Sequence, residues 1–282
     1  MFNTMKKFTL VAALLLISVF AFAQKPVRFG VYLGEATPLG DMGNGTAKKT
    51  TEYPLGDLTK WALDNIKEGT EGYAGIGFNV GFDVTVALPV EGLGVFGGID
   101  FFFNTNNSAL NDALDEYAKN EVKVLDYVSE VKYTKPHFIN IPILFGLNYL
   151  HNFNNIVGIW GEAGVGPNFR LISRYEKTTD YNRAMDVMLP DGEIVTCIEK
   201  RTGATYKSAV TLGFKLGAGV MLWDRMSIGL DYYYLGSAKI EATAIYELGG
   251  TDYADKVYTS KTVKGDNAIS AGEFAVRVGY HF

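Results

Sequence analysis

The sequence has very little cysteine and histidine, and it has no excess of basic residues. Cys197 is the single cysteine among 282 residues, which excludes an intramolecular disulfide and a thiolate metal cluster. The three histidines, His137, His151 and His281, are far apart in the chain, so we expect no histidine-based metal site. Because 26 Lys and Arg residues stand against 31 Asp and Glu residues, no basic excess is available to neutralise the phosphates of nucleic acid.

Long apolar runs are missing beyond the first segment of the chain, so no transmembrane helix is predicted there. Glycine and aromatic residues are abundant, with 32 Gly, 17 Tyr and 18 Phe beside only 8 Pro. A content of 48% hydrophobic and 20% charged residues excludes a disordered chain. This composition is typical of a protein with many strands and tight turns.

The first segment has the features of an export signal. Lys6 and Lys7 precede the apolar stretch Thr9–Phe22, which is too short to span a bilayer as a helix. Ala21 and Ala23 form a small-x-small cleavage pattern before Gln24. We therefore predict a cleaved signal peptide at residues 1–23 and a single domain at residues 24–282. An uncleaved anchor is the alternative, and Met5 is a second candidate for the initiator.

Apolar and polar residues alternate strictly from Ala74 to Leu88, which predicts a long strand with one wholly apolar face. Glycine and polar residues, among them Asp83, occupy the other face. The same alternation recurs in seven further segments: Val27–Ala36, Leu93–Asn104, Phe138–Leu150, Val157–Ile172, Ser208–Leu222, Met226–Leu235 and Glu273–Phe282. Several of these segments are longer than the five or six residues of an ordinary strand.

Short and long connections alternate between these eight segments. The short ones are Pro89–Gly92, His151–Asn155 and Trp223–Arg225, and the long ones are Thr37–Gly72, Thr105–His137, Ser173–Lys207 and Gly236–Gly272. Outer-membrane barrels have this arrangement, with short periplasmic turns and long external loops. We therefore predict an all-β fold, an eight-stranded antiparallel up-and-down transmembrane barrel with four long extracellular loops. A soluble lipocalin-like barrel or sandwich with the apolar face inside is the alternative.

The polar face of the predicted strands carries isolated charges. These are Asp83, Asp100, Glu162, Arg170, Lys215, Asp231 and Arg277. The interior of an eight-stranded barrel is just wide enough for side chains to fill, so we predict that these charges pair and plug the lumen. A thin conducting path or a proton route is the alternative.

The chain ends on a hydrophobic alternation, Phe274, Val276, Val278, Tyr280 and Phe282. This pattern resembles the signal that the outer-membrane barrel-assembly machinery recognises in its clients. Together with "HFINIPILFGLNYL" (137–150), "GIWGEAGVGPNF" (158–169) and "RVGYHF" (277–282), it resembles the PorT-like outer-membrane β-barrel family, small OmpA-like barrels of diderm bacteria. The resemblance implies a fold and a location in the outer membrane. It does not imply one activity, although some family members are implicated in protein secretion.

The long connections are predicted to contain secondary structure. Asp57–Gly69 and Ser108–Lys119 have helical patterns, and Met188–Gly192 has the composition of a hairpin turn. Lys239–Leu248 and Tyr253–Val263 are predicted to form another hairpin, which turns at Gly249 and Gly250.

We expect a non-enzymatic outer-membrane protein that has an envelope-structural role or binds a partner through its extracellular loops. No catalytic residue, cofactor site or metal site is predicted; His137 at the external rim is more typical of a solvated residue than of a catalytic base. The expected partners are outer-membrane lipids, the barrel-assembly machinery during biogenesis, and an extracellular or secretion-system protein. We expect a monomer. The alternatives are an accessory component of a secretion or transport machine, a narrow pore and a lipid-acting barrel enzyme.

Overall fold

The computed structural model describes residues 27–43, 74–134, 137–188, 194–239, 241–249, 256–264 and 268–282. The predicted signal peptide, with its cleavage site at Ala21, Ala23 and Gln24, lies outside the described residues. The helix predicted at Asp57–Gly69 also lies outside them.

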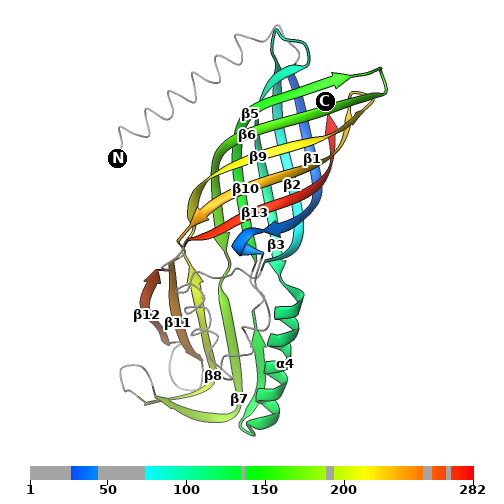
Figure 1. Ribbon diagram of the computed structural model, residues 1–282. Helices are drawn as coiled ribbons and strands as arrows, with labels where there is room; N and C mark the ends of the chain where they lie inside the picture. Colours follow the sequence, from blue (N-terminus) through cyan, green and yellow to red (C-terminus); the bar gives the residue numbers. More distant parts are fainter. Residues whose placement is uncertain are drawn as a thin grey trace, which may run out of the picture.

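Eight antiparallel strands form a closed barrel, as the sequence predicted (Figure 1). They are β1 (Val27–Leu39), β2 (Ala74–Ala87), β3 (Leu93–Asn106), β5 (Phe138–Asn152), β6 (Val157–Ile172), β9 (Ala209–Leu222), β10 (Met226–Ala238) and β13 (Ile269–His281). Each strand pairs with its neighbours in the order β1-β13-β10-β9-β6-β5-β3-β2. The first and last strands close the barrel with Leu33 opposite Val278, so no edge is left unpaired.

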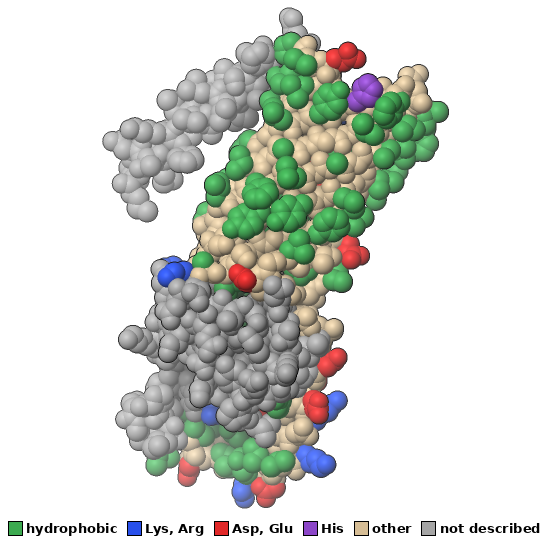
Figure 2. Space-filling model, viewed as in Figure 1, with side chains coloured by type: hydrophobic (Ala, Val, Ile, Leu, Met, Phe, Trp, Pro, Cys, Tyr) green, Lys and Arg blue, Asp and Glu red, His purple; other side chains and the backbone are tan. Residues whose placement is uncertain are grey.

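The apolar face of each barrel strand points outward. Leu33 is 62% exposed and Leu212 is 68% exposed, whereas the intervening polar positions are mostly buried. Figure 2 shows hydrophobic side chains spread over the visible face of the barrel. Charged side chains appear in the same view at the two ends of the barrel and over the second sheet. The alternative of a lipocalin-like barrel or sandwich with its apolar face inside is therefore wrong.

The long connections contain a second sheet that the sequence reading of eight strands did not include. Its strands are β4 (Val128–Tyr133), β7 (Tyr175–Met188), β8 (Ile194–Tyr206), β11 (Glu241–Gly249) and β12 (Lys256–Lys264), in the order β12-β11-β8-β7-β4. β6 leads into β7 after two residues, and β8 leads into β9 in the same way, so the sheet continues beyond the long-loop end of the barrel (Figure 1).

The predictions for individual loops agree with this sheet. The helix predicted at Ser108–Lys119 is α4, which is longer and runs over Ser108–Val124. The two predicted hairpins are the antiparallel pairs β7–β8 and β11–β12. The stretch after the helix, which the sequence pattern left unassigned, contains β4, which pairs with β7 at the edge of the sheet. A short 3-10 turn, η1 (Gly40–Met42), follows β1.

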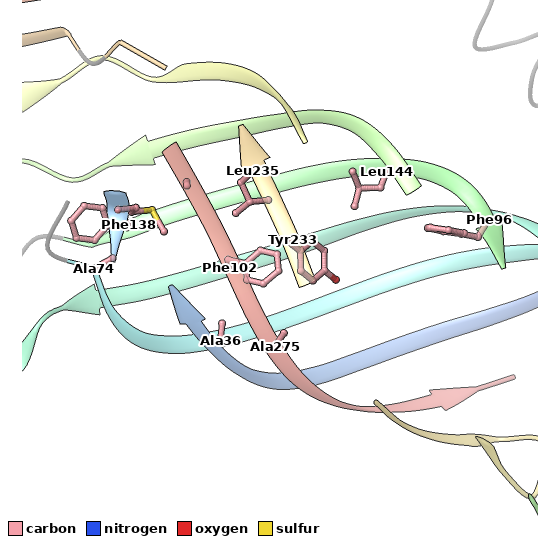
Figure 3. Close-up of a cluster of buried hydrophobic side chains, with 11 residues drawn as sticks. Ala36, Ala74, Phe96, Phe102, Phe138, Leu144, Tyr233, Leu235 and Ala275 are labelled. Carbon is pink, nitrogen blue, oxygen red and sulfur yellow. The ribbon is translucent and has the colours of Figure 1, made fainter. Parts of the chain in front are cut away.

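Buried aromatic and aliphatic side chains form a cluster inside the barrel (Figure 3), and most of them lie in its long-loop half. The rings of Phe102 and Tyr233 pack edge to face with their centroids 4.7 Å apart. Leu144 and Leu235 belong to the same cluster, and both are almost completely buried. Buried polar side chains, described below, share this part of the lumen with the cluster.

Candidate functional site

Five inward-facing charges from five strands meet inside the barrel, and we call them the lumen network. They are Asp100 of β3, Glu162 of β6, Lys215 of β9, Asp231 of β10 and Arg277 of β13. Each side chain occupies the polar parity of its strand, so the alternation of the sequence places all five in the lumen. All five are at most 8% exposed.

Arg277 is the central residue of the lumen network. Its Nε donates to Asp231 Oδ2 at 2.6 Å, its Nη1 to Asp100 Oδ1 at 2.9 Å and its Nη2 to Glu162 Oε1 at 3.2 Å. The guanidinium also lies over the ring of Tyr32, with 4.5 Å between Cζ and the ring centroid. One planar cation therefore joins strands from three sides of the barrel, a geometry that a lysine could not reproduce.

Lys215 supplies the second cation of the lumen network. Its ammonium pairs with Glu162 and lies 3.5 Å from Asp231 Oδ1. Three carboxylates thus share two cations inside the barrel, at a depth from which water is largely excluded. Such a network is stable only if its members remain paired, because an isolated buried charge is costly.

Asp83 and Arg170, which we predicted to be part of the same network, make no ion pair with it among the described residues. Asp83 accepts a hydrogen bond from the hydroxyl of Tyr32. Arg170 donates to the carbonyl oxygens of Ile269 at 2.9 Å and Gly236 at 2.8 Å. The prediction that Arg170 pairs with a lumen carboxylate is wrong for the described part of the chain. Its long side chain instead reaches strand ends at the long-loop rim, where it donates to backbone carbonyl groups.

Sequence reasoning missed a buried polar layer of asparagines and one carboxyl group. The asparagines are Asn79, Asn104, Asn140 and Asn168, all completely buried. Asn168 Nδ2 donates to Leu235 O at 3.0 Å and to Asn140 Oδ1 at 3.1 Å. Glu273 is completely buried, and its Oε2 accepts a hydrogen bond of 3.5 Å from Asn104. The available signal was their inward parity, but the predicted charge network did not use the asparagines and left out Glu273, at the first position of its predicted segment.

Glycines on the inward parity leave room for the charged side chains. A Cβ atom added at Gly217 would overlap with the carboxylate of Asp231, and one added at Gly81 would overlap with that of Asp100. Bulky inward residues fill what remains, since Tyr32, Phe96, Phe102, Trp160 and Tyr233 are all buried. The lumen therefore has the chemistry of a packed polar core.

The second sheet contains a buried ion pair of its own. Lys177 of β7 donates to both carboxylate oxygens of Glu121 of α4, at 2.7 and 2.6 Å. Both side chains are buried, and α4 packs against β4. Burial, and next the nearby Glu121 carboxylate, raise the pKa of Tyr133 well above its usual range. The ion pair joins the helix to the sheet.

The histidines lie at both ends of the barrel, as their sequence positions predicted. His137 precedes β5 at the long-loop end, where its ring packs on Phe103, and His151 is exposed at the short-turn end. His281 Nε2 lies 3.0 Å from the hydroxyl of Ser227. Its Nδ1 has no hydrogen-bond partner among the described residues, so the orienting acid of a hydrolase triad is not present on that nitrogen.

The described ranges have neither a metal-binding cluster nor a membrane-spanning helix. They contain no group of three or more His, Cys, Asp or Glu side chains arranged to bind a metal ion. Of the helices in those ranges, none has both the length and the apolar character that crossing a bilayer requires.

The alternating residues at the carboxyl end of the chain lie on the outer surface. Phe274, Val276, Val278, Tyr280 and Phe282 are between 38% and 74% exposed. β13 pairs on both sides, with β1 and with β10, so this segment is also the strand that closes the barrel. Its role as an assembly signal stays a prediction.

No protein-family model and no curated protein matches the sequence, so the PorT-like resemblance also stays a prediction. Several solved structures of outer-membrane proteins are similar. Ail of Yersinia pestis, in complex with the heparin analogue sucrose octasulfate, is 11% identical, with a TM-score of 0.36 over 91% of this chain and 99% of that chain. OprG from Pseudomonas aeruginosa is 12% identical, with a TM-score of 0.38 over 92% and 97%. A major outer membrane protein from Thermus thermophilus is 13% identical, with a TM-score of 0.42 over 91% and 100%. Because these TM-scores are below 0.5, the fold assignment rests on the strand order and register given above.

Proposed function

We propose that the chain is a monomeric integral protein of the outer membrane, with its short turns and both termini in the periplasm. The observation that carries this proposal is the continuous apolar surface of the closed barrel. Its outward side chains include Phe29, Val31, Leu33, Val80, Phe82, Phe145, Leu147, Val165, Leu212, Leu230, Val276 and Val278, each at least 41% exposed. Exposing so much contiguous apolar surface to water would be unusual for a monomeric soluble protein.

The dimensions of the barrel also support membrane insertion. Its strands contain 13 to 16 residues. At roughly 3.3 Å per residue and a tilt of about 40°, such strands rise roughly 33–40 Å along the barrel axis, enough to span a bilayer. Aromatic side chains surround the short-turn end, namely Tyr149, Phe153, Trp223, Tyr280 and Phe282. Such rings favour the interface between lipid and water.

Membrane residence is tested by fractionation and by gel mobility. We expect the protein in the outer-membrane fraction, resistant to extraction by salt and alkali. It should migrate differently before and after boiling, because a closed barrel keeps its compact shape in cold detergent. A chain that remains soluble in the periplasm without detergent would contradict the proposal.

We further propose that the second sheet acts outside the cell as a non-enzymatic binding or envelope-structural module. Two features support this. The buried Glu121–Lys177 ion pair joins the sheet to α4, and the continuation of the sheet from β6 and β9 holds it beyond the barrel end opposite the short turns. β4 and β12 are its edge strands, and such edges can pair with a strand of another chain.

An accessory role in a secretion machine is the rival, and crosslinking in intact cells separates the two. A photoreactive residue is placed at Ile194 of the second sheet in one strain and at Val90 of a short turn in another; these positions are 67% and 61% exposed. Crosslinks from Ile194 to an extracellular or surface component would support the binding module. Crosslinks only from Val90, to periplasmic machinery, would favour the secretion role and contradict the module.

The absence of enzymatic activity is part of the same proposal. The Ser227–His281 contact has the right residue types for a hydrolase, but it lacks an acid on His281 Nδ1 among the described residues. Lipid hydrolysis by the purified protein that is lost in Ser227→Ala would contradict this part of the proposal.

A further inference from the structure

A cavity of about 760 Å³ opens at the short-turn end of the barrel, on the opposite side from the second sheet. Its polar lining includes Arg28 of β1, Thr85 of β2, and Asn148 and Asn152 of β5. The turn between β2 and β3 forms another wall. This volume lies in the range of small-molecule sites, which are usually between about 300 and 1,000 Å³.

Arg28 is the cation of this cavity, and among the described residues its hydrogen-bonding capacity is largely unused. A guanidinium has five N–H donors. Of these, one makes a long bond of 3.4 Å from Nη2 to Asn148 Oδ1, and the buried Nε has no partner among the described residues. No described carboxylate forms an ion pair with Arg28. Arg277 differs, because its guanidinium pairs with three carboxylates. Arg170 differs as well, because its Nη1 and Nη2 donate to backbone carbonyls, although its Nε also has no partner among the described residues.

The free donors of Arg28 determine which ligand chemistry fits. A guanidinium binds carboxylate and phosphate groups through two parallel hydrogen bonds, and such charge-assisted bonds are the strong ones in proteins. The amide of Asn148 beside it is buried and could accept or donate a further bond. Apolar side chains of Ala87, Leu93 and Leu150 line the remaining walls and would contact the carbon skeleton of a ligand.

We propose that this cavity binds a small organic anion, whose carboxylate or phosphate group pairs with the Arg28 guanidinium. Glu91, in the same lining, is the one feature that opposes an anion. Its side chain is exposed on the turn, where water screens its charge, whereas the Nε of Arg28 is buried. The site is separate from the lumen network and does not depend on a function of the second sheet.

Calorimetric titration of the mature protein in detergent micelles tests the proposal. The probes are succinate, glycerol 3-phosphate and the uncharged succinamide. We expect at least one of the two anions to bind about tenfold or more tightly than succinamide. Binding of succinate alone identifies a carboxylate site, and binding of glycerol 3-phosphate alone identifies a phosphate site. Failure of both anions to bind at millimolar concentration, or equal binding of succinamide, would overturn the proposal.

Three variants locate the site. Arg28→Gln should weaken anion binding about tenfold or more, whereas Arg225→Gln removes an equal charge from an exposed turn at the same end and should leave binding unchanged. Glu91→Gln should leave binding unchanged or tighten it. Equal losses of anion affinity in Arg28→Gln and Arg225→Gln would mean that net charge alone explains the effect. That result would contradict the proposed site.

Nuclear magnetic resonance gives a measurement that needs no variant, should Arg28→Gln fail to fold. The side-chain Nε–H signal of Arg28 in the wild-type protein should shift on titration with the bound anion. An unchanged Arg28 signal, with shifts confined to other parts of the barrel, would refute the assignment.

Discussion

Arg277 is predicted to be the residue whose loss most destabilises the barrel. Arg277→Met keeps much of the volume of the side chain but removes contacts to three carboxylates, those of Asp231, Asp100 and Glu162. Lys215 is then the one cation left in the lumen network. Breaking a buried pair by removing one partner costs about 3–5 kcal/mol, because the other charge remains buried and uncompensated. We expect a loss in this range in the free energy of unfolding.

The assay is reversible urea unfolding in detergent micelles or phospholipid vesicles, followed by tryptophan fluorescence and by heat-modifiable gel mobility. Arg225→Met is the matched control, since Arg225 lies in an exposed turn between β9 and β10. A surface substitution of this kind changes stability by less than about 0.5 kcal/mol. Both variants lose the same charge, so their difference reports the buried contacts.

A double variant tests whether the carboxylates are the cause of the loss. In Arg277→Met combined with Asp231→Leu, one of the stranded charges is absent. We expect the double variant to be more stable than the sum of the two single losses predicts, because the two residues are in direct contact. A loss below about 1 kcal/mol in Arg277→Met, or strictly additive losses, would refute the view that the lumen network stabilises the barrel.

Four further predictions concern other parts of the chain. Phe82→Arg should block assembly, because a lipid-facing arginine near the bilayer midplane costs about 2–4 kcal/mol, whereas Val90→Arg in a short turn should be tolerated. Equal amounts of the two variants in the outer membrane would contradict this prediction. Lys177→Met should expose α4 to protease, because the Glu121 carboxylate then remains buried without its cation, while the barrel keeps its heat-modifiable mobility. An unchanged digestion pattern would contradict the role of the ion pair. Cys197 is almost completely buried, and burial raises the pKa of its thiol. Maleimide should therefore label Cys197 at neutral pH only after the protein is unfolded, and mass spectrometry measures the labelling. Purified protein in planar bilayers should show no stable ion-conducting state, because the lumen is filled; robust conductance would support the transport alternative.

The barrel itself was predictable because its strands carry the strongest pattern that a sequence can have. Outward Phe82 and inward Asp83 differ by one position, and a shift of one residue would place the charge in lipid. The alternation therefore determined which residues face the lumen. The short turns and long connections determined that neighbouring strands run antiparallel. The boundaries of all eight strands follow from these two signals to within a few residues.

The second sheet was only partly visible in the sequence. Its hairpins β7–β8 and β11–β12 follow from local turn residues, so they were predicted. β4 has only six residues and follows a helix, and it becomes a strand because β7 offers it an open edge. The joining of β8 to β11 brings together segments from two different connections, and no local pattern encodes such a pairing.

The partners within the lumen were decided by the tertiary structure alone. The sequence determined that seven charges point inward, because parity is a property of each strand by itself. Which of them meet depends on the stagger of strands around the closed barrel, which sets the level of each side chain along the axis. That stagger brings Arg277 to Asp100, Asp231 and Glu162, and it leaves Arg170 at the rim and Arg28 at the other mouth, beside a cavity. The sequence thus specified the charges of the interior, and the closure of the barrel specified their partners.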